Sequence, residues 1–193
     1  MAEGTKEIHL EEHIVKYLTK IAQPEFPEYT EKDNSCYDKD LCLIPEDLIG
    51  FIKESQPKKY DALCAQYGAN TDAKLLELVA DNINKSKLKT LQVLREKVKD
   101  RGQYLDLVYF KPSHSKTPEH MQGYLKNKLS IIRQLKYSKK NEKSIDIVLF
   151  VNGLPVVTME LKNALTGQYL HNAIKQYIED RDPKEPLLEF KRC

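Results

Sequence analysis

The feature that most constrains the fold is a pair of apolar runs joined by Asn152-Gly153. The runs are IDIVLFV (145–151) and PVVTMEL (155–161). Runs rich in β-branched residues favour strands, and Asn-Gly between two of them is a strong hairpin signal. We therefore predict two adjacent antiparallel strands. The rest of the chain must then complete and cover a sheet.

The part of the chain before residue 102 has mainly helical spacing. In 7–22, apolar residues recur at a helical period at Leu10, Ile14, Tyr17, Leu18 and Ile21. Residues 23–40 contain two prolines and many polar residues, so they are predicted as a loop. Further helices are predicted over 43–55, 57–67, 72–84, 86–98, 119–128 and 167–181, and further strands over 103–110 and 129–137.

This order of elements predicts an α+β domain. A chain of 193 residues suits one domain. We divide it into a mainly helical part, 1–101, and a sheet core, 102–193, that holds the hairpin. The last helix, 167–181, is expected to turn its apolar residues inward; these are Leu170, Ile174, Tyr177 and Ile178.

The cysteines and the hydropathy pattern bear on where the protein works. The four cysteines show neither a CxxC pair nor the spacing of a zinc ribbon, and no signal peptide precedes them. No apolar run approaches the roughly 20 residues that a membrane span needs. We therefore expect a soluble cytoplasmic protein with reduced thiols and no membrane partner.

The charge is distributed unevenly along the chain. The net charge is only +2, yet residues 82–143 hold 16 basic and 5 acidic residues. A basic block of this kind is typical of a surface that faces a polyanion such as nucleic acid. Solvated helix faces rich in lysine give the same pattern, so both interpretations stay open.

Three charged residues stand out in the predicted hairpin. Because side chains alternate along a strand, Glu160 and Lys162 in VVTMELKN (156–163) share one face. Asp146 lies between two isoleucines on the preceding strand, and a buried charge is costly unless it is paired or bound to metal. Two carboxylates suit Mg²⁺, and a neighbouring lysine suits phosphodiester hydrolysis. The alternative is a structural ion pair between Lys162 and either acid.

The register of the hairpin separates these interpretations. If Asn152-Gly153 were a plain two-residue turn, Asp146 would face Met159, and Asp146 and Glu160 would point to opposite sides of the sheet. A shared metal site requires the numbers of paired residues to sum to an even value. We therefore predict either a three-residue loop, which would add Leu154 to the turn, or a β-bulge.

A second short motif could carry a different chemistry. HLEEH (9–13) fits the zinc-peptidase pattern H-x-x-E-H, in which two histidines on one helix face bind the metal. No third ligand can be identified downstream. Surface histidines on an amphipathic helix are the competing interpretation.

An Asp followed by E-x-K on the adjacent strand resembles the PD-(D/E)xK nucleases. More closely, 136–168 and AIKQYIEDRDPKEPLLEFKR (173–192) resemble the amino-terminal nuclease domain of the type I restriction enzyme R subunit, as do LEEHIVKYL (10–18), 43–63 and 98–112. The resemblance implies a restriction-endonuclease-like core, a central mixed sheet flanked by helices, with an extra amino-terminal helical region.

The resemblance also implies roles for the site residues. Asp146 and Glu160 match the metal-binding acids, Lys162 matches the catalytic lysine, and the Leu161 backbone carbonyl would complete the metal ligands. The glutamate of the first helix falls on Glu11, with Glu12 as the alternative.

A glutamine-led motif after the E-x-K strand matches Gln176. Some members of the family have a tyrosine four positions after that glutamine, where this chain has Asp180 and carries the adjacent Tyr177 instead. We expect Gln176 and Tyr177 to contact DNA, although this tyrosine does not stand at the family's position.

The cofactor and the partners follow from the same resemblance. It implies Mg²⁺-dependent cutting of double-stranded DNA without sequence preference, together with modification and specificity subunits. R subunits continue into an ATP-driven translocase motor, but no G-x-x-x-x-G-K-[ST] loop occurs here, so ATP would serve the full-length enzyme rather than this fragment. The alternative is a non-catalytic module that docks DNA or another subunit.

Overall fold

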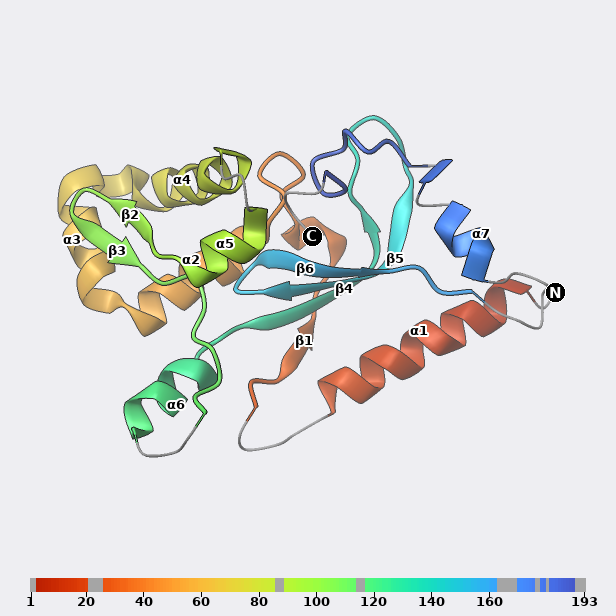
Figure 1. Cartoon of the computed structure of the whole chain (residues 1–193), viewed down its shortest axis with the longest axis horizontal. Coiled ribbons are helices and arrows are strands. Elements are labelled where there is room, and N and C mark those ends of the chain that lie inside the picture. Colours follow the sequence, from red (N-terminus) through yellow and green to blue (C-terminus); the bar gives the residue numbers. More distant parts are fainter. Residues whose placement is uncertain are drawn as a thin grey trace.

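The computed structural model is a mixed β-sheet with helices on both sides and a group of helices at one end (Figure 1). It describes residues 3–20, 26–85, 89–113, 117–162, 170–175, 178–179 and 181–189. This architecture confirms the expected α+β class with helices flanking a mixed sheet. It is compatible with a restriction-endonuclease-like fold.

The helices lie close to where the apolar spacing places them. The α-helices are α1 (Glu3–Thr19), α2 (Pro45–Ser55), α3 (Pro57–Tyr67), α4 (Thr71–Lys85), α5 (Lys89–Arg95), α6 (Pro118–Leu125) and α7 (Leu170–Lys175). Two short 3₁₀ helices are η1 (Asn34–Cys36) and η2 (Gly68–Asn70). Proline occupies the first turn of α2, α3 and α6, where its missing N–H costs no hydrogen bond.

The main sheet has four strands in the order β1-β4-β5-β6. Its strands are β1 (Tyr29–Glu31), β4 (Leu129–Lys136), β5 (Ser144–Val151) and β6 (Leu154–Met159). β1 runs parallel to β4, whereas β4, β5 and β6 are successively antiparallel. A separate ribbon pairs β2 (Val98–Asp100) with β3 (Gln103–Leu105).

Two parts of the predicted organisation need correction. Residues 23–40 were expected to form a loop, yet they contain β1, which can become a strand only because β4 offers it a free edge. The strand expected over 103–110 is only three residues long, and the helix expected over 86–98 ends at Arg95 because Val98 already pairs with Leu105. β1 was missed because its partner β4 lies far along the chain, whereas β2 and β3 form a short local hairpin whose extent apolar spacing does not report.

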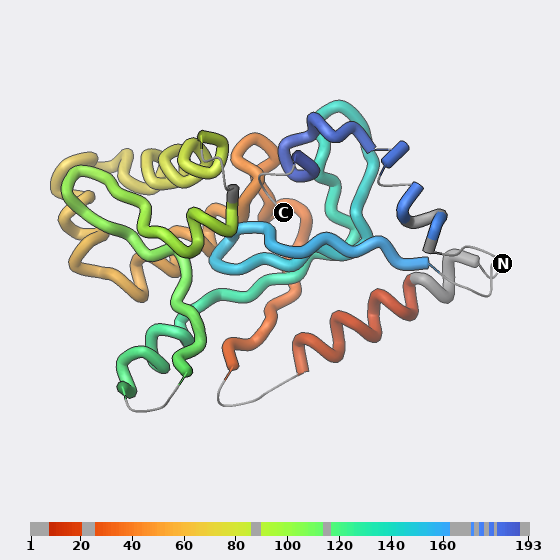
Figure 2. The backbone as a smooth tube through the Cα atoms, in the orientation of Figure 1, coloured from red at the N-terminus to blue at the C-terminus, as the bar shows by residue number. Residues whose placement is uncertain are grey.

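Each face of the main sheet packs against different chain segments. On one face, Ile131, Ile147 and Leu149 pack with Val15 of α1. The other face packs against the segment before α2 and the carboxy-terminal segment; this cluster includes Cys42, Ile44, Ile132, Val148, Phe150 and Leu187. A third cluster holds α2–α5 together at the end of the sheet away from α1 (Figure 2). Leu154 joins that helical cluster to β6.

The buried side of α1 differs from the predicted one. Glu11 and Val15 are buried, and Ile14 and Leu18 are partly buried against the sheet. Leu10 and Tyr17, which were expected to be part of the apolar face, are exposed. The helix is thus rotated so that an acid, rather than a leucine, faces the protein.

The predicted inward face of the last helix is also wrong where the structure describes it. Ile174 is 48% exposed and Ile178 is 72% exposed. The regular helix α7 covers only part of the predicted range 167–181. The side chains of Leu170 and Tyr177 lie outside the described part.

The turn between β5 and β6 is anchored on three sides. Asn152 is fully buried, and it exchanges hydrogen bonds with Lys128: its N–H donates to the Lys128 carbonyl, and its Oδ1 accepts from the Lys128 N–H, both at 2.7 Å. Its Nδ2 donates to the Leu107 carbonyl and to Oδ1 of Asn127, at 2.8 and 2.9 Å. The turn is therefore attached to the start of β4 and to the segment after β3.

Gly153 makes the third attachment, to the start of α2. Its carbonyl accepts the Ile44 N–H at 2.8 Å, so two backbones come into direct contact. The φ angle of Gly153 is +80°, and a Cβ added there would lie 2.3 Å from the Ile44 carbonyl oxygen. Only glycine satisfies both constraints.

The predicted β-bulge is present, and the three-residue loop is not. Asn152 and Gly153 both have positive φ, which is the type I′ pattern of a two-residue turn, and Val151 pairs with Leu154. Beyond the turn, Phe150 pairs with Pro155 but Leu149 pairs with Val157, so Val156 is the extra residue. From the Leu149–Val157 pair to the Ile147–Met159 pair, the numbers of the paired residues sum to an even value. Continued one residue past the Ile147–Met159 pair, it brings Asp146 opposite Glu160.

We predict that Gly153→Ala lowers the free energy of unfolding by about 2–4 kcal/mol, because it adds a backbone clash to the cost of a positive φ. Chemical denaturation measures the change. Gly102→Ala is the matched control, because Gly102 has φ +81° and a Cβ added there would meet no atom within 4 Å. That control should cost only about 1–2 kcal/mol. Equal losses for the two variants would contradict the docking of the turn on α2.

Candidate functional site

Asp146 is held by two neutral hydrogen-bond donors. The Leu161 N–H donates to its Oδ2 at 2.6 Å, and the Gln134 side-chain amide donates to its Oδ1 at 3.1 Å. Asp146 is half-buried. Each carboxylate oxygen has two lone pairs, so both oxygens keep acceptor capacity for a further ligand.

The alternation of side chains between the two faces of the sheet is interrupted at Asp146 and Gln134. Strict alternation would place Ile145 and Ile147 on one face, yet Ile145 packs in the cluster with Leu135, and Ile147 packs under α1. Gln134, which lies across from Asp146 in the β4–β5 register, has φ +47°. A positive φ is uncommon for glutamine, and such backbone strain is often found at functional sites.

The structure brings Glu11 into the same network as Asp146. The Gln134 amide nitrogen donates to Glu11 Oε1 at 2.7 Å, as well as to Asp146. Glu11 is only 5% exposed, whereas the Glu12 side chain is 40% exposed and lies near His9 and Lys16 at the surface. The geometry therefore places Glu11, and not Glu12, beside the hairpin.

Glu160 has a different partner from Asp146. It forms an ion pair with Arg181, and the two side chains are each only 2% exposed. Arg181 also donates to the Ser144 carbonyl at 2.8 Å and to the Tyr137 hydroxyl at 3.1 Å. The backbone register puts Asp146 and Glu160 opposite each other, but the two side chains have different hydrogen-bond partners.

The remaining predicted site residues are placed as follows. Leu161 contributes its N–H to Asp146 and is partly buried beneath α1. Lys162 is half-buried, and within the described part of the chain no hydrogen bond or ion pair joins it to another residue. The alternative interpretation, an ion pair of Lys162 with either acid, is therefore not seen there. Gln176 and Tyr177 lie outside the described residues.

In the part of the chain that the structure describes, metal ligands are not already clustered. Among the residues it describes, no group of three or more His, Cys, Asp or Glu side chains could hold a metal ion. This applies equally to the HLEEH helix, where His9 and His13 are both exposed. An Mg²⁺ site built on one or two carboxylates with water completing the shell remains compatible with Asp146, because its donors leave lone pairs free.

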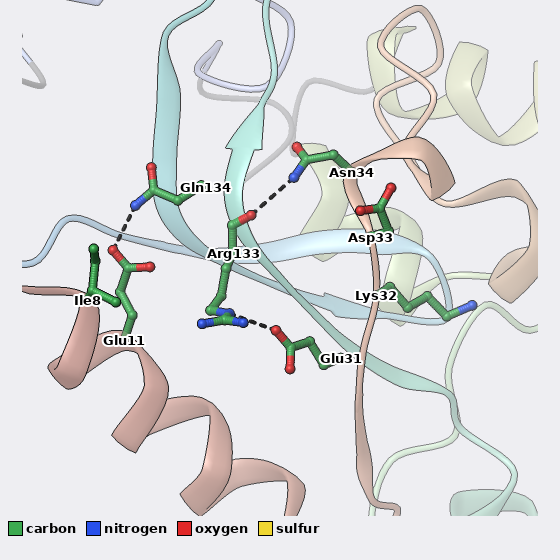
Figure 3. Close-up of a pocket in the computed structure, with 8 residues that line it drawn as sticks. All are labelled: Ile8, Glu11, Glu31, Lys32, Asp33, Asn34, Arg133 and Gln134. Atoms are coloured by element: carbon green, nitrogen blue, oxygen red, sulfur yellow. Dashed lines mark hydrogen bonds and ion pairs between the residues drawn. The ribbon is translucent and has the colours of Figure 1, made fainter.

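An open cleft of about 580 Å³ lies beside this network, between α1 and the strands β1 and β4 (Figure 3). Glu11 and Gln134 form one wall, and Arg133 and the segment after β1 form the other. The basic groups of the cleft are paired: Arg133 binds Glu31 at 2.6 Å and Lys32 binds Asp47 at 2.7 Å. Burial alone would lower the pKa of Lys32, but its hydrogen bonds to Asp47 and Glu46 outweigh burial and raise that pKa.

The basic block at 82–143 does not form one uncompensated surface. Many of its side chains lie in ion pairs with carboxylates, including acids from outside the block. Among the described residues, these pairs include Lys85–Asp81, Lys97–Asp106, Lys128–Glu54, Arg133–Glu31, Lys136–Glu142, Lys139–Asp40, Lys140–Asp182 and Lys140–Glu185. Much of the positive charge is thus neutralised locally, which favours the interpretation as solvated, paired faces over a continuous polyanion surface.

Comparison with known proteins decides the family. The family model of the type I restriction enzyme R protein N terminus matches residues 50–190, nearly three quarters of the chain. The chain belongs to this family. No curated protein and no solved structure matches it significantly. The match confirms the resemblance inferred from the hairpin, and it contains Asp146, Glu160 and Lys162 but begins after α1.

Two site residues were missed by the sequence reasoning on this R-protein domain. Gln134 lies in a strand whose other features are apolar, and Arg181 lies just before Asp182-Pro183, where nothing marks it as a partner of Glu160. Each acts through a contact across many residues, so no local pattern could have identified it.

None of the helices that the structure describes is long and apolar enough to cross a membrane.

We predict that Arg181→Met lowers the free energy of unfolding by about 3–5 kcal/mol, because it leaves the buried Glu160 carboxylate without its cation. Adding Glu160→Gln should recover part of this loss. Both are measured by denaturant unfolding.

The matched control for Arg181→Met is Lys85→Met. Lys85 pairs with Asp81 on the surface, with side chains 76% and 60% exposed, and such pairs contribute about 0–1 kcal/mol. An Arg181 variant no less stable than the Lys85 variant would show that the Glu160–Arg181 pair does not hold the carboxy-terminal segment in place.

Proposed function

We propose that this chain is the nuclease domain of a type I restriction enzyme R subunit and cuts double-stranded DNA with Mg²⁺, without sequence preference of its own. The observation that carries the proposal is the position of Asp146 in the β5–β6 hairpin of this chain, which belongs to the R-protein family. It is bonded to the backbone of the E-x-K segment and linked through Gln134 to Glu11.

The site residues have distinct roles in this proposal. Asp146, Glu160 and the Leu161 carbonyl would hold the metal. A bound Mg²⁺ would polarise the oxygens of the scissile phosphate and offset their developing charge. Lys162, which has no described partner, would orient the attacking water or stabilise the charge on the phosphate. Glu11 would add a further acid beside Asp146, and Gln176 and Tyr177 would contact the DNA.

The ion pair with Arg181 sets a condition on this chemistry. Glu160 can bind a metal only if its carboxylate turns from Arg181 or shares an oxygen with it. A carboxylate has enough lone pairs for two partners. The buried pair therefore holds the Glu160 carboxylate beside Arg181, so a metal would compete with Arg181 for this carboxylate.

The wider setting of the reaction is part of the same proposal. Modification and specificity subunits would recognise the DNA, and a downstream motor would use ATP to bring DNA to this domain in the cytoplasm. ATP would then be required by the full-length enzyme without binding to the residues of this chain.

A second function is favoured by the same ion pair. If Arg181 keeps Glu160 permanently, the chain would be a module that docks DNA or another subunit without cutting. Such a module would bind DNA with an affinity that falls steeply with salt, because phosphate contacts release counterions. Fluorescence anisotropy at several salt concentrations, with Mg²⁺ present and the DNA recovered afterwards, separates binding without cleavage from cleavage.

We predict that Asp146→Ala or Lys162→Ala in the R subunit lowers plasmid cleavage by at least about 100-fold, because each removes a group that stabilises the transition state. Cleavage is followed on supercoiled plasmid with the assembled subunits, ATP and Mg²⁺. ATP hydrolysis by the same preparations should be unchanged.

Lys74→Ala is the matched control for the lysine variant, because Lys74 lies on the surface of α4 in an ion pair with Glu77. This variant should cut normally. Full cleavage by both the Asp146 and the Lys162 variants would refute the site assignment.

A further inference from the structure

The Gln134 side chain connects two acids that come from opposite ends of the sequence. Its single amide nitrogen donates to Glu11 Oε1 at 2.7 Å and to Asp146 Oδ1 at 3.1 Å. The two carboxylate oxygens therefore lie within the combined length of two hydrogen bonds. Without such a donor, two like charges at this separation would repel each other.

The orientation of this amide is fixed by a third residue. The Ser144 hydroxyl donates to Gln134 Oε1 at 2.8 Å. Because the amide oxygen is held by a donor, the NH₂ group must face the acids. Ser144 also accepts from Arg181 through its carbonyl oxygen, so it stands between the Asp146 network and the Glu160–Arg181 pair.

The backbone at Gln134 supports a role beyond packing. Gln134 has φ +47° within a β-strand, and its side chain remains exposed at the cleft wall (Figure 3). A structural residue at this position would be glycine or asparagine, which adopt positive φ at little cost. In this conformation the long amide points at two carboxylates and not into the apolar core.

We propose that Gln134 is a positioning residue that holds Glu11 and Asp146 in place for a divalent cation. This inference rests on the proposed function, since it concerns the same metal site. Gln134 acts by donating one N–H to each acid, and a carboxylate oxygen that accepts one N–H still has a lone pair for the cation. Residues that orient metal ligands in this way commonly change metal affinity by roughly 10–100-fold when they are replaced.

The test is to titrate the 193-residue chain with Mn²⁺ alone. Electron paramagnetic resonance measures the concentration of free Mn²⁺ at each step. Gln134→Gly removes the amide but suits the positive φ, so Mn²⁺ affinity should fall roughly 10–100-fold while the denaturation midpoint stays equal or rises. A purely structural role would move stability and affinity together. Ser144→Ala, which releases the amide oxygen, should weaken Mn²⁺ binding in the same direction.

Arg101→Gly is the matched backbone control. Arg101 also has a positive φ, 45°, but lies in the turn between β2 and β3. Its replacement should leave Mn²⁺ affinity unchanged. Asp146→Ala should abolish binding and so identifies the site being titrated.

Two results would overturn the inference, and they are distinguishable. If the unsubstituted chain binds Mn²⁺ and loses it with Asp146→Ala, but Gln134→Gly binds equally well, the role of Gln134 is refuted and the proposed metal site stands. If the unsubstituted chain binds no Mn²⁺, the metal site fails, and the role of Gln134 fails with it.

Discussion

The docked turn at Asn152-Gly153 is the constraint on which the rest of the structure depends. Asn152 forms hydrogen bonds through its backbone and its side chain to the start of β4 and to the segment after β3. The Gly153 carbonyl accepts a hydrogen bond from the N–H of Ile44, the residue just before α2. These contacts involve polar groups in a fully buried place, where an unpaired group would be costly. The turn thus joins the helical cluster to the sheet and fixes the end from which the β5–β6 register is counted.

The bulge at Val156 shifts this register by one residue between the turn and the candidate site. A two-residue turn alone would leave Asp146 and Glu160 out of step, and the extra residue restores the alignment. The side chains of Asp146 and Glu160 then have different partners. Asp146 is held by neutral donors together with Glu11, whereas Glu160 is neutralised by Arg181 in a nearly dry environment. The site therefore combines two acids bridged by Gln134, the half-buried Asp146 and the buried Glu11, with a third carboxylate whose charge Arg181 compensates.

The sequence predicted the strands β4, β5 and β6 and the helices α2, α3, α4 and α6 with small errors in their ends. It failed at β1, which exists only through pairing with the distant strand β4, and it missed β2 and made β3 too long, because these two strands form only a short local hairpin. It also misjudged α1 and the last helix. In both, apolar residues such as Tyr17 and Ile178 stay exposed. Periodicity identifies a helix but does not say which face meets a neighbour.

By itself, the sequence determined the hairpin and the shared face of Glu160 and Lys162, which follow from local chemistry: β-branched runs, an Asn-Gly turn and a period of two along a strand. It also required a three-residue loop or a bulge if Asp146 and Glu160 are to share a site, and its resemblance indicated the family of the R protein amino terminus. Only the tertiary structure decided that Glu11 rather than Glu12 joins Asp146, that Gln134 bridges them, and that Arg181 pairs with Glu160. Each of these contacts spans a long stretch of chain, and its geometry depends on how whole elements pack rather than on any neighbouring residue.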